Sequence, residues 1–276
     1  MNRDPEGWNF NTIIPTIQLF QHGARSMPRK IIPPFDYILT VTKNCPDIPP
    51  SLQSLIAPTV TPGHTILSVL SGVSMIDAHE EALGTILHEE HDLLFLGAFH
   101  NPIIANPSLE IAEAKKFIGI YNAAAKSTVN FSDDVPWARW RKLIFNACFN
   151  PIRAIAGLDD GRMRLAGSAI EGWVRPAMKW IFETAKQLGH LLPEDIMDTM
   201  INLDPMDLYL KPSMQCDIEK GNYMEYEYLV GEPLREAEKI GMPTPTLKVI
   251  HELCNALQWK TMEARGLVTA PSKRKL

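Results

Sequence analysis

The sequence of 276 residues has few glycines and none of the close glycine pairs that cradle phosphate groups. Its 16 glycines include no two that are separated by a single residue. A dinucleotide-binding loop of the form G-x-G-x-x-G depends on such pairs, because its backbone must approach the pyrophosphate before a helix begins. The usual dinucleotide loop is therefore absent from this sequence.

Cysteines, metal-binding spacings and long apolar runs are scarce as well. The four cysteines lie far apart and form no C-x-x-C pair, which predicts reduced thiols. His88 and His91 are three residues apart, whereas the H-E-x-x-H zinc motif needs a spacing of four, so we expect no metal site. No run approaches the roughly 18 apolar residues of a membrane span, and the first residues lack the apolar segment of a secretory signal. We expect a soluble protein of the cytoplasm.

Neither sign of charge dominates the composition. Lys and Arg number 27 and Asp and Glu number 32, which gives a formal net charge of −5. This balance argues against nucleic acid or an anionic membrane as a partner, and the basic residues near the C-terminus are interpreted as a solvated end. A hydrophobic content of 45% is enough for two modest domains, each with its own core.

Short apolar runs and prolines characterise the first part of the chain. Phe35–Thr42 is rich in β-branched and aromatic residues and is predicted to be a buried strand, as are Thr65–Leu70 and Leu93–Leu96. Between the first two, Ser51 is placed to cap a short helix. The order strand, helix, strand predicts an α/β domain with a parallel sheet over residues 1–133.

The rest of the chain, residues 134–276, shows helical periodicity and is predicted to be an all-α domain. Within it, the segment Ser213-Met-Gln-Cys-Asp217 is followed by Glu225, twelve residues after the serine.

A stripe of three polar residues runs along the first helix of this second domain. Lys142, Asn146 and Asn150 recur every four residues, so their side chains share one helix face. Pro151 cannot donate a hydrogen bond to the carbonyl four residues earlier, and we therefore expect a distortion near Ala147. A polar stripe beside a helix distortion is a candidate ligand site.

Four motifs of the second domain occur in a fixed order. They are W-x-K-L-x-x-N-x-x-x-N-P at Trp140–Pro151, S-M-x-x-D at Ser213–Asp217, E-x-[DE]-x-x-x-G at Glu225–Gly231 and G-x-P-T-P at Gly241–Pro245. In type, order and spacing they resemble the ketopantoate reductase (2-dehydropantoate 2-reductase) family. The resemblance covers about residues 35–257 and implies a truncated Rossmann-like domain followed by a helical domain that binds substrate.

The resemblance implies roles for the polar residues of the second domain. A nicotinamide hydride would reduce the ketone of a 2-keto acid while Lys142 donates a proton to the forming alkoxide. A lysine in a partly dry site has a lowered pKa, which suits proton donation near neutrality. Asn146 and Asn150 would orient hydroxyl and carbonyl groups, and Ser213 would bind the substrate carboxylate. Glu225 would hold a substrate hydroxyl near Lys142, which makes these two the candidate catalytic residues.

The cofactor that the resemblance implies is NADP, but the family's cofactor residues are only partly present. Lys43 follows the predicted strand Phe35–Thr42 and would lie at the cofactor cleft. Ser71 and Gly72 would lie there too, after the strand Thr65–Leu70, where the family has Asn-Gly. Residues 1–34 offer no counterpart to the family's first strand and phosphate loop. The expectation is therefore either NADP held in a reduced site or no cofactor.

Three interpretations of function follow from this combination. The first is a ketopantoate-reductase-like enzyme that reduces a 2-keto acid or related carbonyl compound, with specialised metabolism as one setting. The second is a cofactor-independent isomerase, cyclase or dehydratase that reuses Lys142 and Glu225 for proton transfer. The third is a catalytically silent binding protein. A small molecule is the expected ligand, and the tryptophan- and methionine-rich helices make a homodimer plausible.

Overall fold

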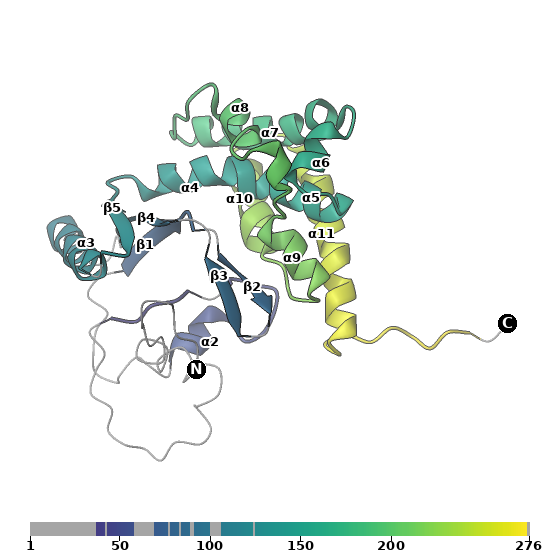
Figure 1. Ribbon diagram of the computed structural model, residues 1–276, viewed down its shortest axis with the longest axis horizontal. Coiled ribbons are helices and arrows are strands. Elements are labelled where there is room, and N and C mark those ends of the chain that lie inside the picture. The colour runs from purple at the N-terminus through teal and green to yellow at the C-terminus, as the bar shows by residue number, and fades with distance from the viewer. Residues whose placement is uncertain are drawn as a thin grey trace, which may run out of the picture. The chain divides into compact units, whose positions relative to one another are not determined.

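The computed structural model describes residues 37–41, 43–57, 69–76, 78–82, 84–88, 91–99, 106–123 and 125–274. The chain divides into two compact units, one of Met1–Val41 with Pro50–Val135 and one of Thr42–Pro49 with Pro136–Leu276. A short segment of the N-terminal part therefore belongs with the second unit. The elements of both units are labelled in Figure 1.

A mixed sheet of three strands forms the centre of the first unit. The strands lie in the order β1-β4-β5, with β1 antiparallel to β4 and β4 parallel to β5. Helix α3 joins the parallel pair and packs against both of its strands, as a β-α-β crossover requires. These elements are β1 (Val69–Ser74), β4 (Asp92–Phe99), α3 (Pro107–Asn122) and β5 (Ser127–Phe131).

A small apolar core lies between the sheet and α3. Leu96 of β4, Phe117 of α3 and Val129 of β5 are buried together, and the ring of Tyr37 packs 5.3 Å from that of Phe117. Two further strands, β2 (Ala78–Ala82) and β3 (Thr85–His88), pair as a separate antiparallel hairpin. The short helix α2 (Leu52–Ile56) begins after Ser51, whose hydroxyl accepts a hydrogen bond from the amide of Ser54 at 3.3 Å. The predicted cap at Ser51 is confirmed.

The strand predictions for this unit have mixed outcomes. Leu93–Leu96 is confirmed, since it lies within β4. Of Thr65–Leu70, only residues 69 and 70 are described, and they begin β1. The prediction for Phe35–Thr42 is wrong over residues 37–41, which have no regular secondary structure, and its other residues lie outside the described ones. A β-branched sequence forms a strand only where it gains a partner and burial, and Val41 is 69% exposed.

The second unit is helical, and one large apolar core runs through it. Its fully buried members include Phe149, Ile152, Met178, Ile181 and Ile250. The predicted combination of an α/β part and an all-α part is confirmed, although only one of the two strand pairings in the three-stranded sheet is parallel. The helices are α4 (Val135–Ile144), η3 (Phe145–Phe149), α5 (Asn150–Ala156), α6 (Asp160–Leu165), η4 (Ile170–Val174), α7 (Arg175–Gln187), α8 (Ile196–Ile201), η5 (Met206–Leu208), α9 (Ser213–Glu219), η6 (Glu227–Gly231), α10 (Glu232–Lys239) and α11 (Pro245–Ala264).

Three of these segments, η3, η4 and η6, are π-helical turns, and each ends two residues before a proline. The prolines are Pro151, Pro176 and Pro233. A proline has no N–H for the carbonyl four residues back, and its ring crowds that carbonyl. Widening the preceding turn by one residue relieves both problems without ending the helix. The distortion predicted near Ala147 is thus present as the turn η3, in which the amide of Asn150 donates to the carbonyl of Phe145.

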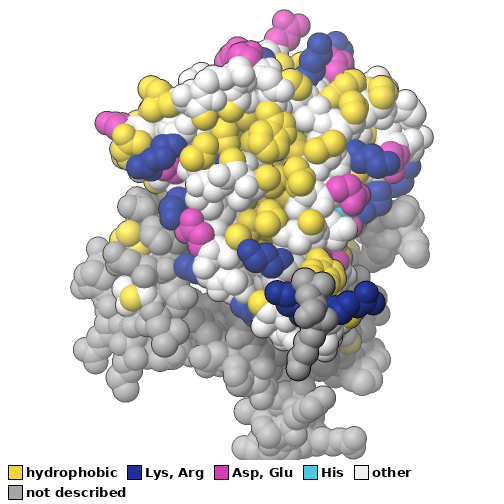
Figure 2. All heavy atoms as spheres, turned by 90° about the vertical axis from the view of Figure 1, so that its right-hand side faces the viewer, with side chains coloured by type: hydrophobic (Ala, Val, Ile, Leu, Met, Phe, Trp, Pro, Cys, Tyr) yellow, Lys and Arg dark blue, Asp and Glu magenta, His cyan; other side chains and the backbone are white. Residues whose placement is uncertain are grey.

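The surface of the second unit leaves several large apolar side chains exposed, among them Leu165, Val249 and Leu253. Figure 2 shows one face of the molecule on which hydrophobic side chains gather between charged ones. No helix in the described part of the chain is both long and apolar enough to cross a membrane. The homodimer expected from the sequence stays a prediction.

Gly97 in β4 has no side chain, which leaves room for the segment Ser132–Val135 of the first unit. A methyl group added at Gly97 should therefore destabilise the protein. A Cβ at Gly97 would lie 2.2 Å from the carbonyl oxygen of Ser132 and 2.6 Å from Cγ2 of Val135. Because a backbone atom cannot move aside cheaply, Gly97→Ala should lower the free energy of unfolding by about 1–3 kcal/mol. Denaturant titration followed by circular dichroism measures this change.

The matched control is Gly119→Ala in the interior of α3, where an added Cβ meets nothing within 4 Å. This substitution should raise the free energy of unfolding by roughly 0.5–1 kcal/mol, because alanine loses less entropy in a helix than glycine. Equal effects of the two substitutions would contradict the close approach at Gly97.

Candidate functional site

Lys142 lies in the last turn of α4, two residues before the buried Ile144. Its side chain is partly buried because the buried Trp140 and Ile144 hold this helix against the core. Burial lowers the pKa of the Lys142 ammonium, and the charge of Glu225 opposes this shift. An amine with a lowered pKa releases its proton more readily than an ordinary lysine, which suits a proton donor.

Glu225 lies two residues before η6, and its carboxylate accepts a hydrogen bond from the backbone amide of Asn44 at 2.6 Å. Burial raises the pKa of the Glu225 carboxyl group, whereas the Asn44 amide and the positive charges of Lys43 and Lys142 lower it. Each member of the Lys142–Glu225 pair therefore acts on the protonation of the other. The structure brings the two candidate catalytic residues into one electrostatic cluster.

Lys43, predicted at a cofactor cleft, forms an ion pair with Asp217 of α9. Asp217 is buried, which raises the pKa of its carboxyl group, while the hydrogen bond from Lys43 lowers it. Asp217 ends the S-M-x-x-D motif, but no role was predicted for it, because its partner lies 174 residues away in the chain. A role of Lys43 in cofactor binding stays a prediction.

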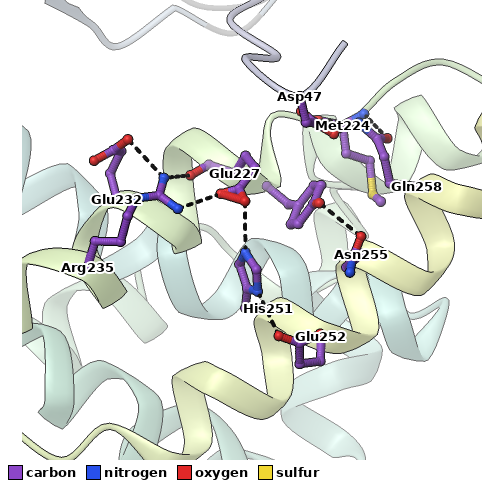
Figure 3. Close-up of polar contacts among 10 residues, drawn as sticks. Asp47, Met224, Glu227, Glu232, Arg235, His251, Glu252, Asn255 and Gln258 are labelled. Carbon is purple, nitrogen blue, oxygen red and sulfur yellow. Dashed lines mark hydrogen bonds and ion pairs between the residues drawn. The ribbon is translucent and has the colours of Figure 1, made fainter. Parts of the chain in front are cut away.

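Gln258 of α11 holds the segment around Lys43 against the helical unit. Its Nε2 donates to Asp47 at 3.0 Å and to the carbonyl of Met224 at 3.2 Å, and its Oε1 accepts from the Met224 amide at 3.0 Å (Figure 3). The side chain of Gln258 is buried, at 1% exposure. One glutamine thus fixes the residue directly before Glu225 and the segment that carries Asn44.

Glu227, two residues after Glu225, is held by side chains of α10 and α11. Its carboxylate accepts from Arg235 at 3.0 Å and lies 3.3 Å from Nε2 of His251 (Figure 3). A Cβ at Gly231 would lie only 2.1 Å from Oε2 of Glu227. This contact explains the spacing of the E-x-[DE]-x-x-x-G motif, because the final glycine leaves space for the carboxylate one turn earlier.

Asn146 and Asn150 are joined by a hydrogen bond across the turn η3. The amide nitrogen of Asn150 donates to Oδ1 of Asn146 at 2.8 Å, and Arg153 donates to Oδ1 of Asn150 at 2.8 Å. The sequence predicted the shared face of the two asparagines but missed Arg153. The sequence did contain an indication of Arg153, because it is the single charged residue in the otherwise apolar stretch Pro151–Ala156.

Ser213 is the first residue of α9, and its side chain is exposed. It lies one helical turn before Asp217, so both side chains share a face of α9. The predicted contact of Ser213 with a substrate carboxylate stays a prediction.

Ser71 and Gly72 lie within β1, where they pair with Gly97 and Leu96 of β4. From the sequence they were expected after the strand Thr65–Leu70, whereas β1 continues through them to Ser74. Their role in cofactor binding stays a prediction. In the described parts of the chain, no glycine-rich turn leads from a strand into a helix. The described residues therefore do not offer a binding site for the pyrophosphate of a dinucleotide, which needs such a turn. Within the same residues, no group of three or more His, Cys, Asp and Glu side chains could hold a metal ion.

Comparison with known proteins places the helical unit in a family. Residues 134–258 match the family described as "Ketopantoate reductase PanE/ApbA C terminal". The crystal structure of 2-dehydropantoate 2-reductase from Methylococcus capsulatus superposes with a TM-score of 0.59 and 27% identity, over 78% of this chain and 68% of that one. Residues 134–258 of the helical unit therefore belong to the family of ketopantoate reductase C-terminal domains.

Other proteins that are similar to this chain are less informative about its function. An uncharacterised protein of Saccharomyces cerevisiae is 32% identical over 211 residues, which cover 75% of this chain and 58% of the yeast protein. The chain thus spans less than two thirds of that relative. A D-mandelate dehydrogenase solved with NADH and anilino(oxo)acetate has a TM-score of 0.59 at 21% identity, over 70% of this chain and 75% of the other, which shows a shared fold.

The mutual influence of Lys142 and Glu225 predicts the effect of removing one charge. In Glu225→Gln, the carboxylate that raises the pKa of Lys142 is lost, so the pKa of Lys142 should fall further. The pH dependence of Lys142 acetylation, followed by mass spectrometry, should shift to lower pH. Glu219→Gln is the matched control, because Glu219 binds Lys211 and is not among the charges that act on Lys142. An equal shift in both variants would contradict the pairing.

Gln258→Ala should loosen the segment around Asn44. The change leaves Asp47 and the backbone of Met224 without their shared partner, which should cost about 1–3 kcal/mol of stability. Amide hydrogen exchange over residues 43–49 should accelerate beyond what the overall loss of stability explains. Gln187→Ala, at an exposed glutamine of the same unit, should change neither quantity. Unaltered exchange at residues 43–49 in Gln258→Ala would show that other contacts hold the segment.

Proposed function

We propose that this chain acts as a ketopantoate-reductase-like enzyme on a 2-keto acid or a related small carbonyl compound, with Lys142 as the general acid. The observation that carries the proposal is the partly buried Lys142, whose pKa is lowered by burial and held up by Glu225. The family membership of the unit that contains it supports the same conclusion.

The chemistry needs a positive group that can give up its proton. Addition of hydride to a carbonyl carbon places negative charge on the carbonyl oxygen, and a nearby ammonium stabilises that charge and then protonates the oxygen. Burial favours the neutral form of Lys142, and Glu225 favours the charged form. Together, the two effects leave Lys142 with a proton that it releases more readily than an ordinary lysine does. Asn146, one turn further along, and Ser213 supply hydrogen-bonding groups for the rest of the substrate.

A nicotinamide cofactor, when bound, supplies the hydride in reductases of this kind. NADP is the form that the resemblance implies, and the NADH in the D-mandelate dehydrogenase of similar fold supports a nicotinamide in general. The described residues do not provide the turn that its pyrophosphate needs. The proposal therefore rests on substrate binding and proton donation by the second unit, and those two tasks use only this unit's residues.

One observation favours a second function, proton transfer without a cofactor. Burial moves the pKa of Lys142 down and that of Glu225 up, so the two groups approach each other in proton affinity. A lysine with a lowered pKa and a carboxyl group with a raised pKa are suited to general acid–base catalysis, which can move a proton between positions of a carbonyl substrate. This activity would serve an isomerase, cyclase or dehydratase.

Substitution of Lys142 tests both functions. Lys142→Ala should reduce turnover by roughly 10²–10⁴-fold, and Lys142→Arg should keep the charge but not the transferable proton. Oxidation of NADPH or NADH with 2-dehydropantoate measures the reductase, and deuterium exchange at C3 of 2-oxobutanoate measures the cofactor-free reaction. The rate of reduction should fall as pH rises through the lowered pKa of Lys142, because only the protonated form donates.

Two results would contradict these functions separately. Turnover in Lys142→Ala equal to that of the unaltered protein would exclude Lys142 as the acid in either reaction. If millimolar NADPH and NADH leave the tryptophan fluorescence and the melting temperature unchanged, the reductase is excluded and the cofactor-free reaction remains.

A further inference from the structure

Three polar side chains, Arg153, Asn150 and Asn146, form a chain of hydrogen bonds that runs one way. Arg153 Nη2 donates to Oδ1 of Asn150, and Nδ2 of Asn150 donates to Oδ1 of Asn146, each over 2.8 Å. Asn150 is only 6% exposed and Arg153 only 2%. Asn150 and Arg153, the inner part of this series of hydrogen bonds, are therefore shielded from water.

The direction of these hydrogen bonds is fixed by the chemistry of arginine. A guanidinium group has donors and no acceptor, so the atom of Asn150 that faces it must be the oxygen. The nitrogen of Asn150 then faces Asn146, which must turn its own oxygen inward. The remaining group of Asn146 is its NH₂, and no described residue accepts a hydrogen bond from it.

Arg153 is itself held firmly. Its guanidinium carbon lies 4.3 Å from the ring centre of Phe149 and 5.1 Å from that of Phe145. Its Nη1 donates to Asp160 at 3.3 Å and to the carbonyl of Leu210 at 3.5 Å. A planar cation fixed by rings and oxygens has no freedom to turn and release Asn150.

We infer that Arg153 is a positioning residue that acts through Asn150 to present Asn146 to the ligand as a hydrogen-bond donor. The ligand group that Asn146 contacts must then be an acceptor, such as a carboxylate or carbonyl oxygen. The orientation stands on the side-chain contacts alone, whereas the identity of the ligand as an oxo acid rests on the proposed function.

Asparagine side-chain NMR tests the orientation directly. In protein labelled with ¹⁵N-asparagine, the Asn150 amide protons should exchange slowly with solvent, and those of Asn146 should exchange faster and shift when 2-dehydropantoate is added. In Asn150→Asp, both carboxylate oxygens accept, so one should bind Arg153 and the other should turn the Asn146 NH₂ inward. The Asn146 protons should then become protected, and the affinity for 2-dehydropantoate should fall about ten-fold or more.

Asp160→Asn is the matched control, because it removes the ionic partner of Arg153 but leaves the contact with Asn150. It should lower stability and leave both the Asn146 signals and the affinity within about two-fold of the unaltered protein. Asn146 protons that are already protected in the unaltered protein would overturn the inference, even if Asn150→Asp does not fold. If the orientation holds but 2-dehydropantoate shifts no signal, the positioning role stands and the proposed substrate class is wrong.

Discussion

The missing N–H of Pro151 is the constraint on which the rest of the candidate site depends. Because this proline cannot complete an α-helical turn, the chain widens into η3 between α4 and α5 while the helix continues. Asn146 lies in the widened turn and Asn150 directly after it, so their hydrogen bond spans the distortion. A strict α-helix through this point would require a donor that proline lacks.

Opposite charges form the second organising feature. Two lysines, Lys43 and Lys142, meet two carboxylates, Asp217 and Glu225, in a partly buried cluster of the helical unit. Burying one charge alone would be costly, and the four groups reduce that cost for one another. The backbone amide of Asn44 adds a neutral donor that stabilises the ionised form of Glu225.

Helical spacing and the properties of proline predicted those features of the site that involve residues close together in the sequence. Helical spacing placed Asn146 and Asn150 on one face, and the properties of proline located the distortion, because both depend on residues within one or two turns. The partnership of Lys43 with Asp217 joins residues 174 positions apart, which no local pattern contains. The strand predicted at Phe35–Thr42 failed over the described residues for a related reason, since strand propensity does not say whether a partner strand is present.

The segment of residues 42–49 has a consequence for how the chain can be divided into fragments. It packs with the helical unit, yet the chain continues from both of its ends into the first unit. The backbone therefore crosses between the units at residues 41 to 42, 49 to 50 and 135 to 136. A fragment cut at residue 134 would lack Lys43 and Asn44, and with them the partners of Asp217 and Glu225. The loop that carries Lys43 and Asn44 is thus joined at both of its ends to the first unit, although its side chains and backbone contact the helical unit.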